Sequence, residues 1–216
     1  MPRLALFDMD RTLVRKNTAA LYVRYQREIG EATVVDSVRA GWWLLQYTLG
    51  VVDAEAVAVK ALRQAIGQHE TVLAARCDDW FRRDVAKHIA CDARRTVDGH
   101  LQAGDVCAVE TGSTVYAARP LARLLGIPHV IATELECDAE GRFTGRHVHL
   151  CYGKGKIARS EALAIANQTS LREAAFYSDS ISDLPLLERV GTPIVVNPDL
   201  RLGRVAKQRG WRVEKW

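Results

Sequence analysis

Short apolar runs that end abruptly at polar residues alternate with longer helix-like segments along most of this 216-residue chain. The runs that predict strands are 4–7, 106–109, 130–132, 174–177, 194–196 and a closing edge strand at 211–213. Helix-like segments lie among them at 93–103, 115–126, 156–167, 182–190 and 199–209. Strands separated by helices favour a parallel, doubly wound α/β sheet with right-handed crossovers.

The segment between the first two strands is much longer than a crossover needs. From about residue 18 to residue 87 it consists of amphipathic stretches rich in Ala, Val, Leu, Glu, Arg and Trp, with Gly30, Gly50 and Gly67 as expected stops. We expect a helical cap domain at 16–87, inserted after the first strand of a core domain at 1–15 and 88–216. A hairpin flap is expected at 135–150, with a turn at Glu140–Gly141 and a second break at Gly145.

Composition excludes several classes of protein. The chain is 48% hydrophobic and 26% charged with 6 prolines, which allows a large core and excludes general disorder. The formal net charge of +4 is too mild to indicate nucleic-acid binding, so no nucleic-acid partner is expected. A basic run near the C-terminal end is interpreted as a solvated helix face and tail; it comprises Arg201, Arg204, Lys207, Arg209, Arg212 and Lys215.

Cysteine usage and the N-terminal residues indicate a cytoplasmic protein. The five cysteines form no CxxC pair and make a poor disulfide framework. Residues 1–7 do not resemble a signal peptide. The most apolar stretch, Trp42–Val52, is about half of the roughly 20 residues that a bilayer crossing needs, so we expect no transmembrane helix. This stretch fits cap core, an apolar lid or a membrane-facing patch.

Polar residues follow several of the predicted strands at the point where each strand ends. Ligands bind at the carboxyl ends of the strands in an open parallel sheet. Two carboxylates at i and i+2 on a strand end, such as Asp8 and Asp10, repel each other unless a cation or a shared proton compensates, which predicts a divalent metal. The residues expected at this edge are Asp8, Asp10, Thr12, Thr111, Gly112, Ser113, Ser178, Asp179, Asp183 and, opening the intervening helix, Lys156.

Each of these residues alone also fits an ordinary structural role. Asp183, Thr111 and Ser113 suit helix caps, and Lys156 suits a solvated helix face. Their order at consecutive strand ends favours a shared site. His147 and His149 alternate along the predicted flap and could be two zinc ligands, but no third ligand is evident nearby.

The polar strand ends resemble the four motifs of the haloacid dehalogenase (HAD) superfamily of aspartate-nucleophile phosphatases. Phe7–Leu13 resembles the DxDxT motif and 109–113 the hydroxyl-bearing second motif; 153–156 resembles the third motif with its lysine, and 177–183 the acidic fourth. The helical insertion after the first strand is similar to the phosphoserine-phosphatase-like subclass. The resemblance implies a Rossmann-like core and the hydrolysis of phosphomonoesters.

The resemblance also implies a role for each site residue. Asp8 would attack phosphorus, Asp10 would serve as general acid and base, and Lys156 would neutralise the phosphoryl oxygens. Mg²⁺ would be held by Asp8, Asp179 and the main-chain carbonyl of Asp10. The remaining assignments are phosphoryl binding by Thr111, Gly112 and Ser113, and orientation of Lys156 or of metal-bound water by Asp183.

Substrate identity is expected to depend on the predicted cap. The phosphoserine phosphatases that the chain resembles have a glutamate where this chain has Asn17, so phosphoserine is expected to be a poor substrate. Arg15 and Asn17 are predicted to contact the substrate, and Arg15, Lys16 and Arg24 would suit an additional anionic group.

Three functions fit these observations. The first is a Mg²⁺-dependent phosphomonoesterase that acts on a small phosphorylated metabolite. The second is the same reaction on a lipid phosphate, with peripheral contact to the membrane surface. The third is a phosphorylatable switch that resembles a response-regulator receiver. Asp10 disfavours this third function, because an acid/base group would hydrolyse the phosphoaspartate that a switch must retain. The sequence does not indicate the oligomeric state.

Overall fold

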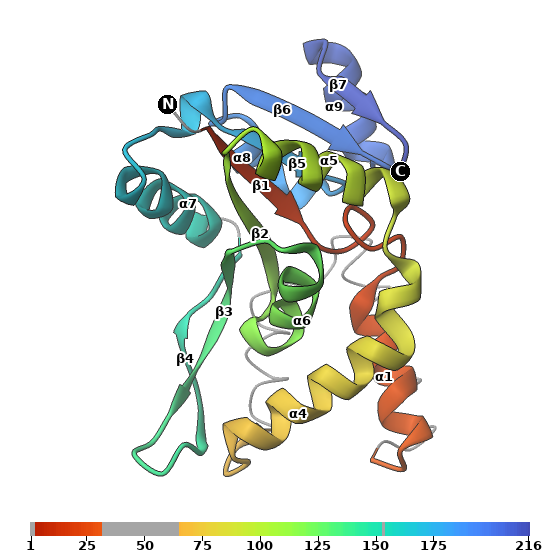
Figure 1. Cartoon of the computed structure of the whole chain (residues 1–216), viewed down its shortest axis with the longest axis vertical. Coiled ribbons are helices and arrows are strands. Elements are labelled where there is room, and N and C mark those ends of the chain that lie inside the picture. The colour runs from red at the N-terminus through yellow and green to blue at the C-terminus, as the bar shows by residue number, and fades with distance from the viewer. Residues whose placement is uncertain (1–2, 32–64, 153) are drawn as a thin grey trace.

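The computed structural model describes residues 3–31, 65–152 and 154–216, and a seven-stranded sheet runs through it (Figure 1). The strand order is β4-β3-β2-β1-β5-β6-β7. All neighbours are parallel except β4, which pairs antiparallel with β3. The strands are β1 (Leu4–Asp8), β2 (Val106–Thr114), β3 (His129–Cys137), β4 (Phe143–His149), β5 (Ala175–Ser178), β6 (Thr192–Val196) and β7 (Arg212–Glu214). The predicted doubly wound α/β sheet is confirmed.

Two apolar clusters cover the two faces of this sheet, because successive residues of a strand point to opposite sides. In β1, Ala5 and Phe7 belong to one cluster, and Leu4 and Leu6 belong to the other. The first cluster contains α5 (Cys91–Gln102) and α6 (Val115–Leu125). The second contains α7 (Lys154–Ala166), α8 (Leu184–Leu187) and α9 (Leu200–Arg209). Burial on both faces explains why β1 is entirely apolar until Asp8.

The described residues between β1 and β2 are largely helical, as predicted. They form α1 (Thr18–Glu28) and α4 (Glu70–Trp80), and α4 continues into the short helical turns η2 (Phe81–Val85) and η3 (Ala86–His88). Tyr25, Trp80 and Phe81 join the same apolar cluster as Phe7 of the sheet. The division into a cap at 16–87 and a core at 1–15 and 88–216 stays a prediction, and the stretch Trp42–Val52 lies outside the described residues.

The flap is a β-hairpin, as predicted, but one of its expected breaks is wrong. β3 and β4 pair antiparallel, and Gly141 adopts a φ of 77° in the turn between them. Gly145 does not end a strand. It lies within β4 at a φ of 84°, where the pairing with β3 shifts register, so its conformational freedom bends the strand.

Two other boundaries differ from expectation because of pairing that is not local in sequence. β2 continues beyond Val109 to Thr114, since its end pairs with β3 through a register shift. The helix expected at 182–190 is shorter: η5 (Ile181–Asp183) precedes α8, which ends at Leu187. A further short turn, η4 (Leu171–Glu173), precedes β5. No helix in the described part of the chain combines the length and the apolarity that crossing a membrane requires.

Candidate active site

The carboxyl ends of β1, β2 and β5 meet at one edge of the sheet and bring the predicted acidic residues together. Asp8 is the last residue of β1, and Asp179 follows directly after β5. Lys156, in the first turns of α7, extends toward Asp8 and Asp183: its Nζ lies 3.3 Å from Asp8 Oδ1 and 2.7 Å from Asp183 Oδ1. Asp8, Lys156, Asp179 and Asp183 are all buried. The structure therefore assembles one buried ionic cluster from residues far apart in the sequence.

Gly155 allows Lys156 to reach this cluster. A Cβ atom at Gly155 would lie 2.2 Å from the main-chain oxygen of Leu150, far inside van der Waals contact. The N–H of Gly155 also donates a 2.9 Å hydrogen bond to the carbonyl oxygen of Tyr152. The start of α7 therefore lies directly against the chain that precedes it, which fixes the origin of the Lys156 side chain.

Asp183 anchors the lysine and is not a helix cap. It occupies the residue before α8, yet its side chain makes no capping hydrogen bond. One carboxylate oxygen contacts Lys156, and the other accepts a 2.7 Å hydrogen bond from the Ser178 hydroxyl at the end of β5. This geometry agrees with the predicted role of Asp183 in orienting Lys156.

Asp10 is held by the first residue of α1. Its Oδ1 accepts a 2.5 Å hydrogen bond from the N–H of Thr18. Burial raises the pKa of Asp10, and this hydrogen bond opposes the shift. Burial is the main cause of the rise. A carboxyl group that retains its proton toward neutral pH can act as a general acid.

The carboxylates of this cluster repel one another strongly. Burial raises the pKa of Asp8 well above its usual value, and Asp183, Asp179 and Asp10 add to the rise while Lys156 opposes it. Burial and the carboxylates of Asp183 and Asp10 raise the pKa of Asp179 to about 8. A hard divalent cation would stabilise the ionised forms of these oxygen donors, so the cluster fits the predicted Mg²⁺.

No group of three or more His, Cys, Asp and Glu side chains suited to a metal ion occurs among residues 3–31, 65–152 and 154–216. The predicted Mg²⁺ set is compatible with this finding, because it consists of two carboxylates and a main-chain carbonyl. His147 and His149 lie in β4, but the described part of the chain does not supply them with the further ligands that a zinc site needs.

The second motif is held rigidly beside the cluster. Thr111 is buried, and its Oγ1 accepts a 3.2 Å hydrogen bond from the N–H of Ser113. The carbonyl oxygen of Gly112 accepts a 2.9 Å hydrogen bond from the hydroxyl of Thr133 in β3. The cap of α6 is Thr114, whose side chain accepts from the N–H of Ala117, so neither Thr111 nor Ser113 caps that helix.

The two residues predicted to contact the substrate, Arg15 and Asn17, lie just before α1. Asn17 is the N-cap, since its Oδ1 accepts a 3.0 Å hydrogen bond from the N–H of Ala20. Arg15 is exposed, and its main-chain N–H donates to the carbonyl of His88 at 2.9 Å. No hydrogen bond or ion pair in the described part of the chain joins either side chain to the acidic cluster, and their contact with substrate stays a prediction.

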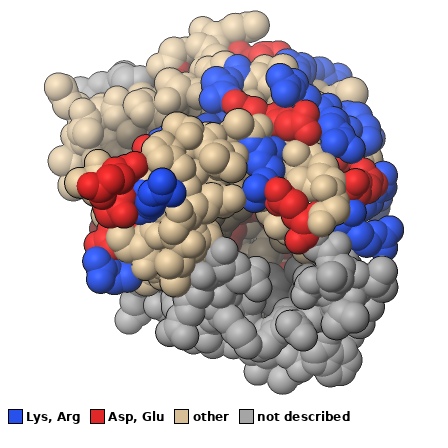
Figure 2. Space-filling model, turned by 90° about the horizontal axis from the view of Figure 1, so that it is seen from below, with Lys and Arg blue, Asp and Glu red and all other residues tan. Residues whose placement is uncertain are grey.

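Charge on the helical side of the molecule is mostly paired. Arg24 forms an ion pair of 2.8 Å with Glu28, and Arg83 also contacts Glu28. Figure 2 shows Lys and Arg side chains interspersed with Asp and Glu on the face seen from below. Arg24 is therefore already neutralised, which weakens its predicted attraction for a second anionic group of the substrate.

Sequence reasoning missed Glu110, a fully buried carboxyl group within β2. It is the register partner of Asp8 on the neighbouring strand. Burial raises the pKa of Glu110 to about 8, which Lys156 opposes. The available signal was a single acidic residue directly after the apolar run 106–109.

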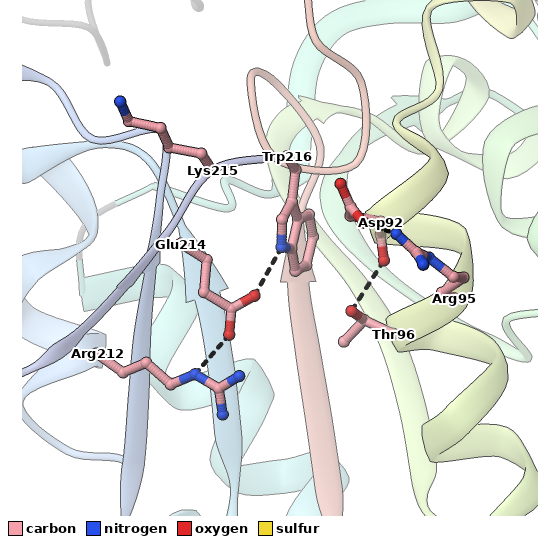
Figure 3. Close-up of a pocket in the computed structure, with 7 residues that line it drawn as sticks. All are labelled: Asp92, Arg95, Thr96, Arg212, Glu214, Lys215 and Trp216. Carbon is pink, nitrogen blue, oxygen red and sulfur yellow. Dashed lines mark hydrogen bonds and ion pairs between the residues drawn. The ribbon is translucent and has the colours of Figure 1, made fainter.

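A separate hollow of about 490 Å³ lies between α5 and the C-terminal residues (Figure 3). Glu214 accepts hydrogen bonds of 2.7 Å from both Arg212 and the indole N–H of Trp216, and Asp92 pairs with Arg95. The charged side chains that line the hollow therefore largely pair with one another. None of the predicted catalytic residues lines the hollow.

Comparison with known proteins agrees with this geometry. A model of the haloacid dehalogenase-like hydrolase family matches residues 5–188. A Neisseria meningitidis protein named histidinol-phosphatase is 31% identical over 99% of this chain and 98% of its own. A Mycobacterium tuberculosis protein named phosphoserine phosphatase SerB1 is 32% identical over 97% of this chain and 69% of its own.

Solved structures show the same fold. The crystal structure of a protein of unknown function from Bordetella pertussis Tohama I is 32% identical, covers 99% of both chains and has a TM-score of 0.88. A substrate-bound phosphoserine phosphatase, 18% identical over all of this chain and 93% of its own, has a TM-score of 0.72.

Replacing Gly155 with alanine is expected to lower kcat/KM by about 100-fold, since a displacement near 1 Å of a catalytic group can cost that much. The added Cβ would collide with the Leu150 carbonyl and move Lys156. Gly203→Ala in α9 is the matched control, because its Cβ would meet only Pro198 at an ordinary 3.7 Å. Steady-state kinetics on both variants check this, and equal activity of the two would contradict it.

Replacing Glu110 with glutamine is expected to flatten the pH dependence of stability. The native pKa of Glu110, about 8, lies above its usual 4.5, so the native state binds the proton more tightly than the unfolded state. The stability that this proton contributes is fully present below the usual pKa of 4.5 and is lost as the pH rises toward 8. Thermal unfolding in EDTA should show Glu110→Gln gaining a few degrees over the wild type between about pH 5 and about pH 8. If the melting temperatures of the two proteins changed in parallel with pH, the raised pKa of Glu110 would be contradicted.

Proposed function

The chain belongs to the haloacid dehalogenase-like hydrolase family and is a phosphatase, and we propose that it hydrolyses phosphomonoesters of small metabolites through a phosphoaspartate formed on Asp8. The observation that carries the proposal is the buried cluster in which Lys156 contacts both Asp8 and Asp183. Family membership decides for an enzyme over the receiver-like switch.

In the first step Asp8 attacks phosphorus and the leaving alkoxide departs. One Asp8 oxygen forms the new P–O bond, and the electron pair of the broken P–O bond passes to the leaving oxygen, which takes a proton from Asp10. The raised pKa of Asp10 supports this role because the group must carry a proton before reaction. Lys156 would face the phosphoryl oxygens while it remains anchored by Asp183.

In the second step water cleaves the phosphoaspartate. Asp10, now ionised, accepts a proton from the attacking water, whose oxygen forms a new bond to phosphorus. The P–O bond to Asp8 breaks with its electron pair passing to Asp8, which restores the carboxylate and releases phosphate. The hydrogen bond from Thr18 to Asp10 keeps the carboxyl group oriented through both steps. Asp10 therefore donates a proton in the first step and accepts one in the second.

Mg²⁺ would be held by Asp8, Asp179 and the main-chain carbonyl of Asp10. Bound there, it supplies positive charge that neutralises the acidic residues and the phosphoryl group. The mutual repulsion of Asp8, Asp179 and Asp10 supports this assignment. The Thr111 hydroxyl accepts a bond from Ser113, so its own hydrogen can be donated to a phosphoryl oxygen beside the Gly112 amide.

For the substrate, we favour histidinol phosphate over phosphoserine. The histidinol-phosphatase relative matches almost the full length of both chains. Asn17 supplies no negative charge for a substrate ammonium, and its side-chain oxygen already caps α1. The cap at 16–87 would contact the leaving group. The lipid-phosphate alternative depends on Trp42–Val52, which lies outside the described residues.

Asp8→Asn is expected to lower the release of phosphate by at least about 10⁴-fold, because an amide cannot attack phosphorus. Removal of divalent ions with EDTA should also abolish turnover of the wild type, and added Mg²⁺ should restore it. Phosphate release from an aryl phosphate checks both. Wild-type activity in the variant would exclude Asp8 as the nucleophile, and full activity in EDTA would exclude the metal.

Wild-type enzyme is expected to hydrolyse histidinol phosphate with a kcat/KM at least about 10-fold above that for phosphoserine, the size of one missing charge-assisted hydrogen bond. Asn17→Asp keeps a helix cap and adds a carboxylate, so it should raise the value for phosphoserine several-fold. A panel with both compounds, sugar and nucleotide monophosphates, lysophosphatidate and phosphatidylglycerol phosphate tests this. Preference for phosphoserine or for a lipid would refute it.

A further inference from the structure

Glu110 is an unusual residue for the interior of a strand. It is fully buried, and the strand residues that precede it are apolar. One carboxylate oxygen, Oε1, accepts a 3.0 Å hydrogen bond from the Ser160 hydroxyl, while Oε2 has no partner among the described residues. Burying a carboxyl group with one oxygen unsatisfied is costly, so the position calls for a compensating use.

The Glu110 side chain faces the helix that carries the catalytic lysine. Side chains point alternately to the two faces of the sheet along β2, so Glu110 lies on the same face as Ala108 and opposite to Val109. Ala108 belongs to the apolar cluster that includes residues of α7. Ser160 follows Lys156 by four residues, one helical turn, and therefore lies on the same side of α7. The hydrogen bond between Glu110 and Ser160 thus joins β2 to α7 next to the root of Lys156.

Glu110 is also the third acidic group around the Lys156 ammonium. Asp183 and Asp8 contact Nζ directly, and Glu110 adds its field from the interior. Burial lowers the pKa of Lys156, but the three carboxyl groups outweigh it, and the pKa stays well above its usual value. The flexible stem of a lysine has no geometric preference of its own, so its place depends on such surroundings.

We propose that Glu110 is a positioning residue for Lys156, which it fixes beside Asp8 through the hydrogen bond to Ser160. The proposal rests on the proposed function, because Lys156 matters only if phosphate is bound there. Without Glu110 the hydrogen bond from Ser160 to β2 would be lost, and the part of α7 that carries Lys156 could shift. The proposal gives Glu110 a cost in stability and a benefit in catalysis, two effects of opposite sign.

Three variants test the proposal. Glu110→Leu removes the carboxyl group and its hydrogen bond, Glu110→Gln keeps an oxygen that can accept from Ser160, and Ser160→Ala removes the donor. Each is compared with the wild type for kcat and KM on an aryl phosphate with Mg²⁺, for the affinity of inorganic phosphate by calorimetry, and for thermal unfolding. Phosphate affinity reports the placement of Lys156 without turnover.

For Glu110→Leu we expect kcat to fall by about 10- to 100-fold, phosphate to bind more weakly, and the melting temperature to stay equal or rise. Glu110→Gln should keep kcat within about 3-fold at neutral pH, the rescue that a positioning role predicts. Ser160→Ala should share the loss, and combining it with Glu110→Leu should add little, because both remove one contact.

Unchanged kcat and phosphate affinity in Glu110→Leu would overturn the proposal. A loss of activity that follows a lower melting temperature, or that is equally large in Glu110→Gln, would also overturn it, since either marks a merely structural or a different role. These outcomes are separable from failure of the proposed function. In that case the wild type itself would show no Mg²⁺-dependent hydrolysis that Asp8→Asn abolishes.

Discussion

The contact of the Lys156 ammonium with the carboxylates of Asp8 and Asp183 is the interaction on which the site depends. Burial raises the pKa of Asp8 well above its usual value, and a protonated carboxyl group is a poor nucleophile. Lys156 is the main cation that opposes this shift. The contact spans elements distant in the sequence, so it forms only when β1, α7 and the residue before α8 are aligned.

The sheet provides that alignment. Both faces of β1 are covered by apolar clusters, so the strand ends are fixed and the polar residues gather at one edge. The helical insertion is tied to the same edge, because the first residue of α1 donates a hydrogen bond to Asp10. A movement of α1 would therefore reach Asp10, the proposed acid/base residue, directly. The residues predicted to contact the leaving group and the residue proposed to protonate it belong to one continuous segment.

Local patterns were sufficient to predict the strands, most of the helices and the principal site residues. Asp8 and Asp179 stand where apolar runs end, and such endings are readable from neighbouring residues alone. Lys156 was predictable only together with its glycine-flanked motif. The positions of these residues depend on short-range sequence. The resemblance to the family motifs added the chemical role expected of each residue.

Long-range pairing explains what sequence reasoning missed. β2 extends to Thr114 because it pairs with β3, and the helix expected at 182–190 is shortened to Leu187. Nothing local indicates that Glu110 faces Ser160 on a helix 50 residues later. Asn17 caps α1, a role typical of asparagine before a helix, and this role was not among those predicted for it.

The central claim is that Asp8 carries the phosphoryl group during turnover. The most direct measurement is rapid mixing of enzyme, Mg²⁺ and substrate, acid quenching within the first turnover, and mass mapping of the peptide that contains Asp8. The account predicts a phosphate adduct on Asp8 that forms before phosphate is released and then decays. Release of phosphate without an adduct at any quench time, or with an adduct on another residue, would contradict it.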